Sequence, residues 1–298
     1  MVIIKNLFQA TRPSFLLITI LGCLIGTASP DSHQASWHIQ ALSIMVAITV
    51  HAAANVMNDY FDHINGSDAL NIDRISPFTG GSRFIQNQTL SPQSIFYFAA
   101  VLALICISIG LYVCYETTWL LMPIGLMGIF IGWAYSAPPL ELMSKGIFGE
   151  IAIAIAWSLI VIGFAALETH QFEMEAILLG LAYGLMVSNI LLINQIPDIR
   201  ADMTANKLTL ATRYSKKGLQ YWYTCIWLAA YLSQLSAVFY FSAPKISLIT
   251  AVLIPAFLRC ARQINDAALS REKLKTLIIH NIVSVHLYAA LLCIALFI

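Results

Sequence analysis

The sequence is short of charged residues. Only 10% of its 298 residues are Asp, Glu, Lys or Arg, and 59% are hydrophobic, whereas an average soluble domain is about 25% charged. A chain of this composition cannot cover a water-facing surface with polar groups, so it is predicted to be an integral membrane protein. The net charge of +1 argues against nucleic acid or an acidic polymer as a partner.

The sequence also lacks paired cysteines and internal linkers. Its six cysteines form no CxxC pair and have no zinc-ligand spacing, so we interpret them as small buried or lipid-facing residues. No low-complexity stretch and no strong repeat divides the chain. We therefore expect residues 1–298 to form a single membrane-embedded domain.

Long apolar runs, by contrast, recur along the whole chain. A membrane-spanning helix needs about 20 apolar residues. The runs predict an all-α polytopic fold with about nine transmembrane helices. We interpret the first run as a retained span, because no small-residue cleavage site follows it. The candidate spans are Phe15–Ala28, Ile39–Met57, Ser94–Tyr115, Trp119–Trp133, Phe148–Leu167, Ala176–Ile193, Tyr223–Phe241, Ile246–Leu258 and Leu277–Ile298.

The basic residues support this number and predict an orientation. With nine spans and a cytoplasmic N-terminus, fifteen of the sixteen Lys and Arg residues lie on the cytoplasmic side. Only Lys245 lies opposite. Cytoplasmic loops of membrane proteins carry an excess of Lys and Arg, so a cytoplasmic N-terminus is expected.

A first cluster of polar residues lies at the cytoplasmic end of the second predicted span. Asn55, Asn58, Asp59 and Asp62 are spaced i, i+3, i+4 and i+7, which places them on one face of a helix. His51 continues that face one turn deeper. Because it lies within an apolar span, we expect it to face the interior, either as pocket lining or in an interhelical hydrogen bond.

A second cluster follows the sixth predicted span. Asn194, Asp198 and Asp202 recur every four residues, which predicts one face of a helical extension of that span. Pro197 removes a backbone donor beside Asp198 and is expected to disturb the helix there.

Acidic side chains on one face repel each other near a membrane, and cations relieve the repulsion. Carboxylate and amide oxygens favour Mg²⁺ or Mn²⁺, and Mg²⁺ keeps open positions for phosphate oxygens. Lys207, Arg213, Arg74 and Arg83 in the same loops offer partners for an anion. A diphosphate with a lipid tail is the expected substrate. The alternative, solvated helix ends that pair with nearby basic residues, explains neither the helical register nor the Asn residues.

Four motifs together resemble the UbiA-type membrane prenyltransferase superfamily, and the resemblance covers essentially the whole chain. The motifs are Asn58-Asp59-Tyr60-Phe61-Asp62, Asp198-Ile199-Arg200-Ala201-Asp202 with Lys207 and Arg213 after it, Tyr135-Ser136-Ala137-Pro138-Pro139 through Lys145, and Arg12-Pro13. The resemblance implies helices around a central cavity and Mg²⁺-dependent transfer of a polyprenyl group from its diphosphate to an aromatic acceptor.

The first motif departs from the pattern of many family members. Gly66 occupies a position where they have a further Asp, and the acid comes at Asp68 instead. This spacing is similar to the branch that prenylates 1,4-dihydroxy-2-naphthoate in menaquinone synthesis. The acceptors 4-hydroxybenzoate, homogentisate and a porphyrin remain open.

The resemblance also implies roles for individual residues. The predicted metal ligands are Asp59, Asp62, Asp68, Asp198 and Asp202. Tyr135 is the expected partner of the allylic cation. The predicted substrate-binding residues are Arg12, His51, Asn55, Asn58, Arg74, Lys145, Asn194, Lys207 and Arg213.

The sequence argues against two other classes of membrane protein. A cation-coupled transporter would place its acids near the bilayer midplane, on internal repeats, and a CDP-alcohol phosphotransferase has one compact motif that is missing here. The absence of a transit peptide favours a prokaryotic cytoplasmic membrane, with the active site facing the cytoplasm.

Overall fold

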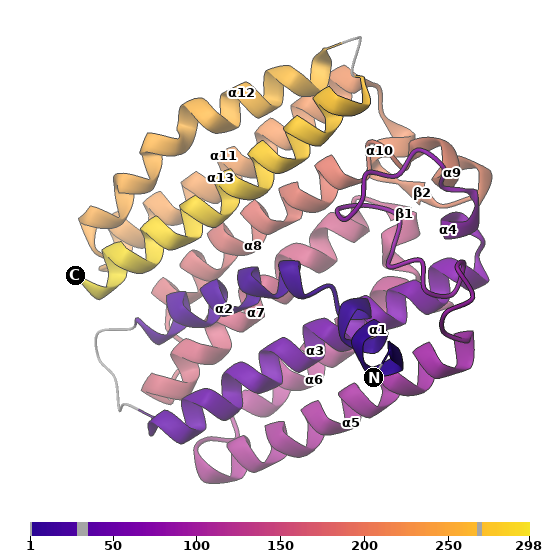
Figure 1. Ribbon diagram of the computed structural model, residues 1–298. Helices are drawn as coiled ribbons and strands as arrows, with labels where there is room; N and C mark the ends of the chain where they lie inside the picture. Colours follow the sequence, from indigo (N-terminus) through magenta and orange to yellow (C-terminus); the bar gives the residue numbers. More distant parts are fainter. Residues whose placement is uncertain (1, 29–34, 267–269) are drawn as a thin grey trace.

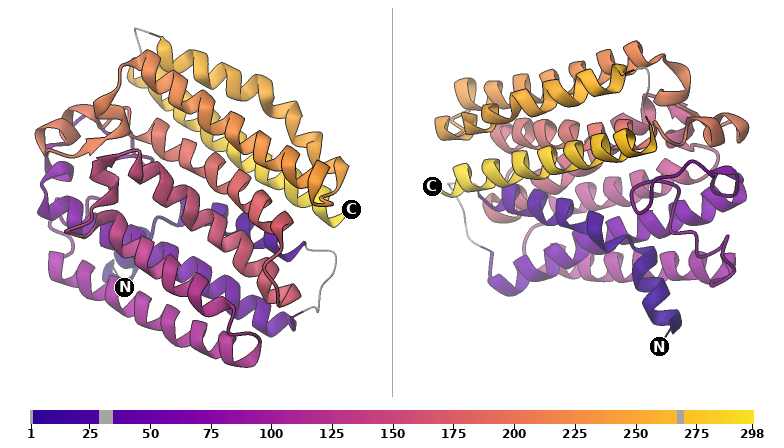
Figure 2. Two further views of the ribbon diagram at one scale, coloured as in Figure 1. Left: turned by 180° about the vertical axis from the view of Figure 1, so that it is seen from behind. Right: turned by 45° about the horizontal axis from the view of Figure 1, so that its top comes forward.

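A computed structural model describes all residues except 1, 29–34 and 267–269. Long helices lie side by side along most of the molecule (Figures 1 and 2), and the two strands of the described residues are two residues each. The helices are α1 Val2–Ala10, α2 Pro13–Thr27, α3 Trp37–Ile64, α4 Ser67–Leu70, α5 Pro92–Glu116, α6 Leu121–Ser136, α7 Phe148–Thr169, α8 Met174–Asn194, α9 Ile199–Thr204, α10 Leu210–Arg213, α11 Lys216–Tyr240, α12 Ile254–Asn265 and α13 Arg271–Phe297, with 3-10 helices η1 Leu142–Ser144 and η2 Lys245–Leu253.

Each predicted span falls on helical structure, so the all-α polytopic fold is confirmed. The spans correspond to α2, α3, α5, α6, α7, α8, α11, η2 with α12, and α13. Within the described residues, six helical segments are long and apolar enough to cross a membrane, or seven if α1 and α2, bent by 49°, form one span. Nine crossings and the cytoplasmic N-terminus therefore stay predictions.

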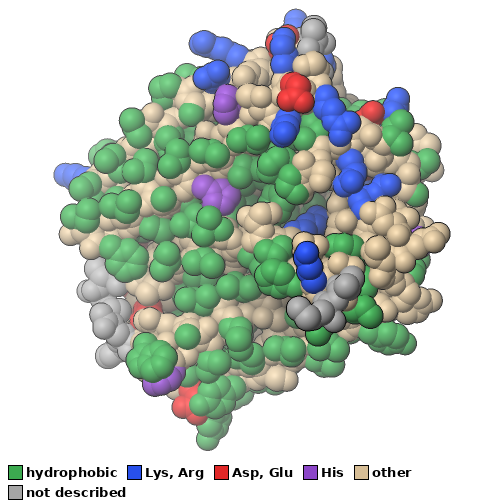
Figure 3. Space-filling model, in the orientation of Figure 1, with side chains coloured by type: hydrophobic (Ala, Val, Ile, Leu, Met, Phe, Trp, Pro, Cys, Tyr) green, Lys and Arg blue, Asp and Glu red, His purple; other side chains and the backbone are tan. Residues whose placement is uncertain are grey.

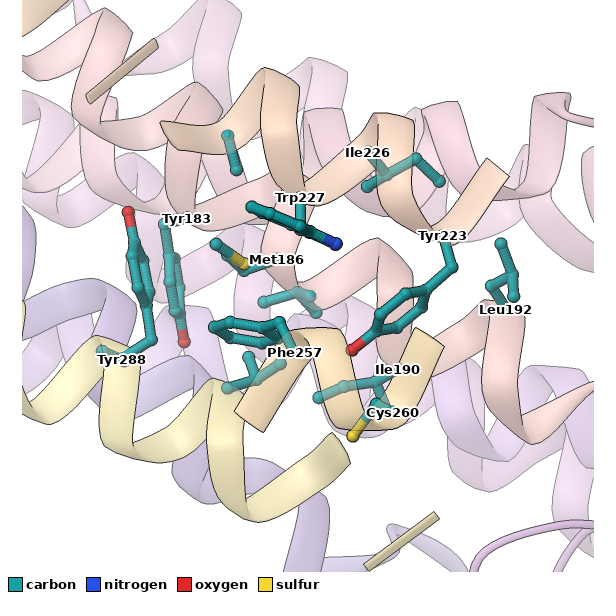
Figure 4. Packing of buried hydrophobic residues seen from close by; sticks show 14 of the residues in the cluster. Tyr183, Met186, Ile190, Leu192, Tyr223, Ile226, Trp227, Phe257, Cys260 and Tyr288 are labelled. Atoms are coloured by element: carbon teal, nitrogen blue, oxygen red, sulfur yellow. The ribbon is translucent and has the colours of Figure 1, made fainter. Parts of the chain in front are cut away.

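Glycines allow α2, α7 and α8 to pack backbone against backbone. A Cβ added at Gly184 would lie 2.0 Å from the Ala154 carbonyl oxygen, and one at Gly26 would lie 2.3 Å from the Val161 carbonyl oxygen. Beside these helices, α8, α11, α12 and α13 bury a cluster of large aromatic side chains, including Tyr223 (Figure 4).

The predicted helical extension of the sixth span is wrong. Helix α8 ends at Asn194, and a turn leads to α9, for which Asp198 is the N-terminal cap residue. Pro197 lies in that turn, where its missing N–H and fixed φ oppose continuation of a helix. Asn194, Asp198 and Asp202 nevertheless line the same cavity.

The strands β1 Lys145–Gly146 and β2 Leu208–Thr209 tie two distant connections together. They pair in parallel, Lys145 with Leu208 and Gly146 with Thr209. The connection after α6 therefore holds the segment that carries Lys207. Charged groups gather at this end: in the view of Figure 3, Lys and Arg side chains lie mainly along the upper and right-hand edges, and hydrophobic side chains cover most of the rest.

Candidate active site

A polar cavity of about 140 Å³ lies where α3, α4 and α9 meet. Its walls come from the two acidic clusters and from residues 78–81 of the connection between α4 and α5. Nine predicted site residues line it: Arg12, Asn58, Asp62, Asp68, Tyr135, Asn194, Asp198, Asp202 and Lys207.

Two basic side chains neutralise the aspartates of α3. Arg12, which links α1 and α2 in a left-handed conformation with φ 55°, donates to Asp59 and to the Asn58 Oδ1 at 3.0 Å. Lys207 Nζ donates to the Asp62 Oδ1 at 2.9 Å. The backbone N–H of Ser82 also donates to Asp59. Asp59 is buried and is not among the described residues that line the cavity. The helical register thus brought Asn58 and Asp62 to the cavity and placed Asp59 in its supporting wall.

Asp68 and two amide residues that line the cavity have oxygens without a hydrogen-bond partner among the described residues. These oxygens are Asp68 Oδ2, Asn71 Oδ1 and Asn194 Oδ1, and all three are buried. Gly81, with φ 67°, lets the backbone pass so close to Asp68 that an added Cβ would lie 2.4 Å from Oδ2. Burial and the charges of Asp62 and Asp59 raise the pKa of Asp68 to about 7.

The second cluster faces the first across the cavity. Asn71 donates to the Asp198 Oδ1 at 2.7 Å. Burial raises the pKa of Asp198 and raises that of Asp202 to about 7, although Lys207 opposes this effect. Burial lowers the pKa of Lys207, but the carboxylates of Asp62 and Asp202 outweigh it, so the pKa lies above its ordinary value.

The donor set suits a hard divalent cation. Within the described part of the chain, no group of three or more His, Cys, Asp or Glu residues is arranged to hold a metal ion, and Arg12 and Lys207 pair with the α3 carboxylates. The unpartnered carboxylate and amide oxygens of Asp68, Asn71 and Asn194 are nevertheless ligands of the kind that Mg²⁺ prefers. In their chemistry these residues fit such an ion.

An apolar cavity of about 360 Å³ adjoins the polar one. It lies between α3, α5, α6 and α7, and Arg12, Asn58 and Tyr135 line both cavities. His51 and Asn55 line only the apolar cavity. The His51 Nδ1 lies 2.7 Å from the Thr19 hydroxyl, so both interpretations of His51, pocket lining and interhelical hydrogen bond, apply.

Three predicted substrate-binding residues are not among the described residues that line either cavity. Lys145 is exposed and donates to the Pro139 carbonyl at 3.0 Å. Arg213 is exposed and donates to the Leu208 carbonyl at 3.2 Å. Arg74 lies beside Gly80, at the edge of the polar cavity.

Sequence reasoning missed several residues of the polar site. Asn71, Thr79 and Gly81 line the cavity, but they lie in an irregular connection where no periodicity marks them. Gln195 also lines it. Its side chain accepts from the Ala211 N–H and donates to the buried Glu150, which ties α7 to the turn after α8.

Long apolar helices thus place buried carboxylates and basic side chains beside an apolar cavity, which is an arrangement suited to a membrane enzyme. The chain belongs to the UbiA prenyltransferase family, whose family model matches residues 16–295. It is thus a prenyltransferase.

Relatives of assigned function lie mainly in one branch of the family. A 1,4-dihydroxy-2-naphthoate octaprenyltransferase of Bacillus subtilis is 29% identical over 214 residues, covering 71% of this chain and 67% of the relative. A 2-carboxy-1,4-naphthoquinone phytyltransferase of Synechocystis is 24% identical, covering 72% and 67%.

Solved structures show the same fold. A UbiA homologue from Archaeoglobus fulgidus bound to DMAPP and Mg²⁺ superimposes with a TM-score of 0.68 at 15% identity, covering 96% of this chain and 99% of that one. A digeranylgeranylglyceryl phosphate synthase gives a TM-score of 0.67 at 17% identity, covering 100% and 99%.

Proposed function

We propose that this chain transfers a polyprenyl group from a polyprenyl diphosphate to 1,4-dihydroxy-2-naphthoate, with loss of CO₂, in a reaction that depends on Mg²⁺ or Mn²⁺. One observation carries the proposal: the polar cavity joins the apolar cavity at Arg12, Asn58 and Tyr135. A prenyl diphosphate has the same division into an anionic head and an apolar tail. The naphthoate relatives support the choice of acceptor.

The head of the donor would occupy the polar cavity. Asp62, Asp68, Asp198 and Asp202 would hold the divalent ion there, with Asp59 supporting them. A bound ion supplies charge neutralisation for the diphosphate as it leaves. Lys207 and Arg12 would turn from the carboxylates to the diphosphate, since both lie at the cavity wall.

The reacting carbon would lie at the junction of the cavities. The allylic C–O bond breaks, and its electron pair leaves with the diphosphate. The ring carbon that bears the carboxylate forms the new C–C bond. The bond from that carbon to the carboxylate then breaks, its electron pair returns to the ring and CO₂ leaves. The Tyr135 ring, which lines both cavities, would stabilise the allylic cation by about 0.5–2 kcal/mol. The apolar helices keep water away until the ring attacks.

The test is an assay of the purified protein in liposomes, with octaprenyl diphosphate, Mg²⁺ and either 1,4-dihydroxy-2-naphthoate or 4-hydroxybenzoate. We expect a prenylated, decarboxylated naphthoquinol by mass. Asp62→Asn and Asp198→Asn should each lower kcat about 100-fold or more. Asp73→Asn is the matched control, because Asp73 is half exposed and pairs with Arg200 at the surface.

Product with 4-hydroxybenzoate alone would overturn the choice of acceptor and retain prenyl transfer. No product with any aromatic acceptor, from folded protein, would overturn the proposed function. Activity without an ion gradient would exclude the transporter interpretation.

A further inference from the structure

The apolar cavity extends far from the reacting centre. Along α6 its lining runs from Tyr135, beside the polar cavity, to Leu121 near the opposite end of the helix. Fourteen residues at 1.5 Å each make this about 21 Å. A cavity of this depth can hold much more than one isoprene unit.

Glycines of α6 leave this space open. Among the described residues, nothing lies within 4 Å of a Cβ built on Gly125 or on Gly128. Helix packing does not require glycine at either position, in contrast to Gly184, whose Cβ would collide with the backbone of α7. Glycine weakens a helix interior, so two such glycines on a cavity wall indicate that the free space itself is used.

Gly128 and Gly125 lie on either side of an opening to the lipid along α6. Ile107 and Leu111 of α5 and Leu126 of α6 line the cavity, yet their side chains are 39%, 44% and 58% exposed. The wall between α5 and α6 is therefore incomplete at this depth. Gly128 is seven residues from Tyr135, about 10 Å along the helix, and Gly125 is about 15 Å away.

We propose that Gly125 and Gly128 form the passage for long isoprenoid tails and so determine the tail length that the enzyme accepts. The inference rests on the proposed function. A short tail ends before Gly128. A long tail passes Gly128 to reach the opening between α5 and α6, and a tail that continues along α6 passes Gly125 as well.

The experiment compares Gly128→Phe, Gly125→Phe and wild type with geranyl, geranylgeranyl and octaprenyl diphosphates at a fixed acceptor concentration. Gly128→Phe should retain the wild-type kcat/KM for geranyl diphosphate and lose roughly 10- to 200-fold for octaprenyl diphosphate, the range for a size mismatch in an apolar pocket. Gly125→Phe should begin to discriminate at longer tails than Gly128→Phe does. Met127→Phe is the control, because Met127 is on the same helix, 48% exposed and outside the cavity lining.

An equal fall for all tail lengths in folded Gly128→Phe, or an unchanged value for octaprenyl diphosphate, would overturn the inference. A wild type without turnover would instead refute the proposed function. In that case the binding of the same diphosphates, followed by tryptophan fluorescence, still decides the inference. Affinity should increase with tail length in the wild type and level off earlier in Gly128→Phe.

Discussion

Asp62 illustrates how unevenly charge is compensated in the polar cavity. It accepts hydrogen bonds from Asn58, Asn65 and Lys207, whereas the Asp68 Oδ2 has no partner among the described residues. Arg12 and Lys207 form the ion pairs of the site, with Asp59, Asp62 and Asp202, and Arg83 donates to the Asp68 backbone carbonyl. A buried site with excess negative charge attracts cations and protons, and the two compete.

This competition predicts a pH dependence for ion binding. The pKa of Asp68 is raised from 3.8 to about 7, so the carboxyl is increasingly protonated below pH 7. A ligand carboxyl must lose its proton to bind a metal ion. We expect the Mg²⁺ affinity to fall by about tenfold per pH unit below 7 for each carboxyl that must ionise, as measured by calorimetric titration at pH 8, 7 and 6.

The raised pKa of Asp68 also predicts how the stability of the ion-free protein depends on pH. Because the folded pKa lies above the unfolded one, the folded state binds more protons between pH 3.8 and 7, and stability falls as the pH rises through that window. Asp68→Asn should reduce the pH dependence of both the free energy of unfolding and the Mg²⁺ affinity. Equal Mg²⁺ affinities at pH 8 and pH 6 in the wild type would contradict the assignment of Asp68.

The sequence predicts residues of the site where regular structure places them. The spacing of Asn58 and Asp62 puts both on one face of α3, and the structure brings both to the cavity. Lys145 and Arg213 have a suitable charge but lie outside the cavity. The sequence shows that these residues are basic, but it does not show how far they lie from the site. Asn71 escaped prediction because its position depends on the tertiary path of an irregular connection.

Among the elements, α7 and α8 depend on close backbone approach. The Ser158 hydroxyl donates to the Gly180 carbonyl at 3.0 Å, and Gly184 lies against Ala154. Because lipid tails are as apolar as the helix surfaces, the hydrophobic effect does not drive helices together within a membrane. Close packing and hydrogen bonds such as these stabilise the association of the helices instead.

We expect Gly184→Ala to reduce the free energy of unfolding by about 1–3 kcal/mol, because its Cβ would force α7 and α8 apart. Thermal unfolding in detergent measures the loss as a lower Tm. Gly125→Ala is the matched control, since open space surrounds its Cβ; its Tm should equal or exceed that of the wild type. If both variants had the same Tm, the packing argument would be wrong.

The limits of the helices are predictable to different degrees. Apolar length located every long helix, because a span must be apolar whatever its neighbours are. The fourfold spacing after Asn194 fits a continuing helix, whereas Pro197 predicts a disturbance of that helix. The structure has a turn at Pro197 and a new helix after it, so the prediction from Pro197 is confirmed. Periodicity within a short polar segment does not distinguish these two arrangements.

On the scale of the whole molecule, the orientation in the membrane depends on how many helices cross it. One open question is whether helix α11 crosses the membrane. It has 25 residues, but it is not among the six helical segments that are both long and apolar enough to cross a membrane. Lys217 near its start and Lys245 beyond its end are both exposed, and the nine-span prediction places them on opposite sides.

A cysteine introduced at each of these two positions tests the prediction. In a Cys225→Ser background, which removes a native thiol that is only partly buried, Lys217→Cys should react with a membrane-impermeant maleimide in inside-out vesicles, and Lys245→Cys only after permeabilisation. The excess of basic residues on the cytoplasmic side is the physical reason. Equal labelling of both cysteines in sealed vesicles would mean that α11 does not cross. The later spans would then be inverted, and the argument from basic residues for a cytoplasmic active site would fail.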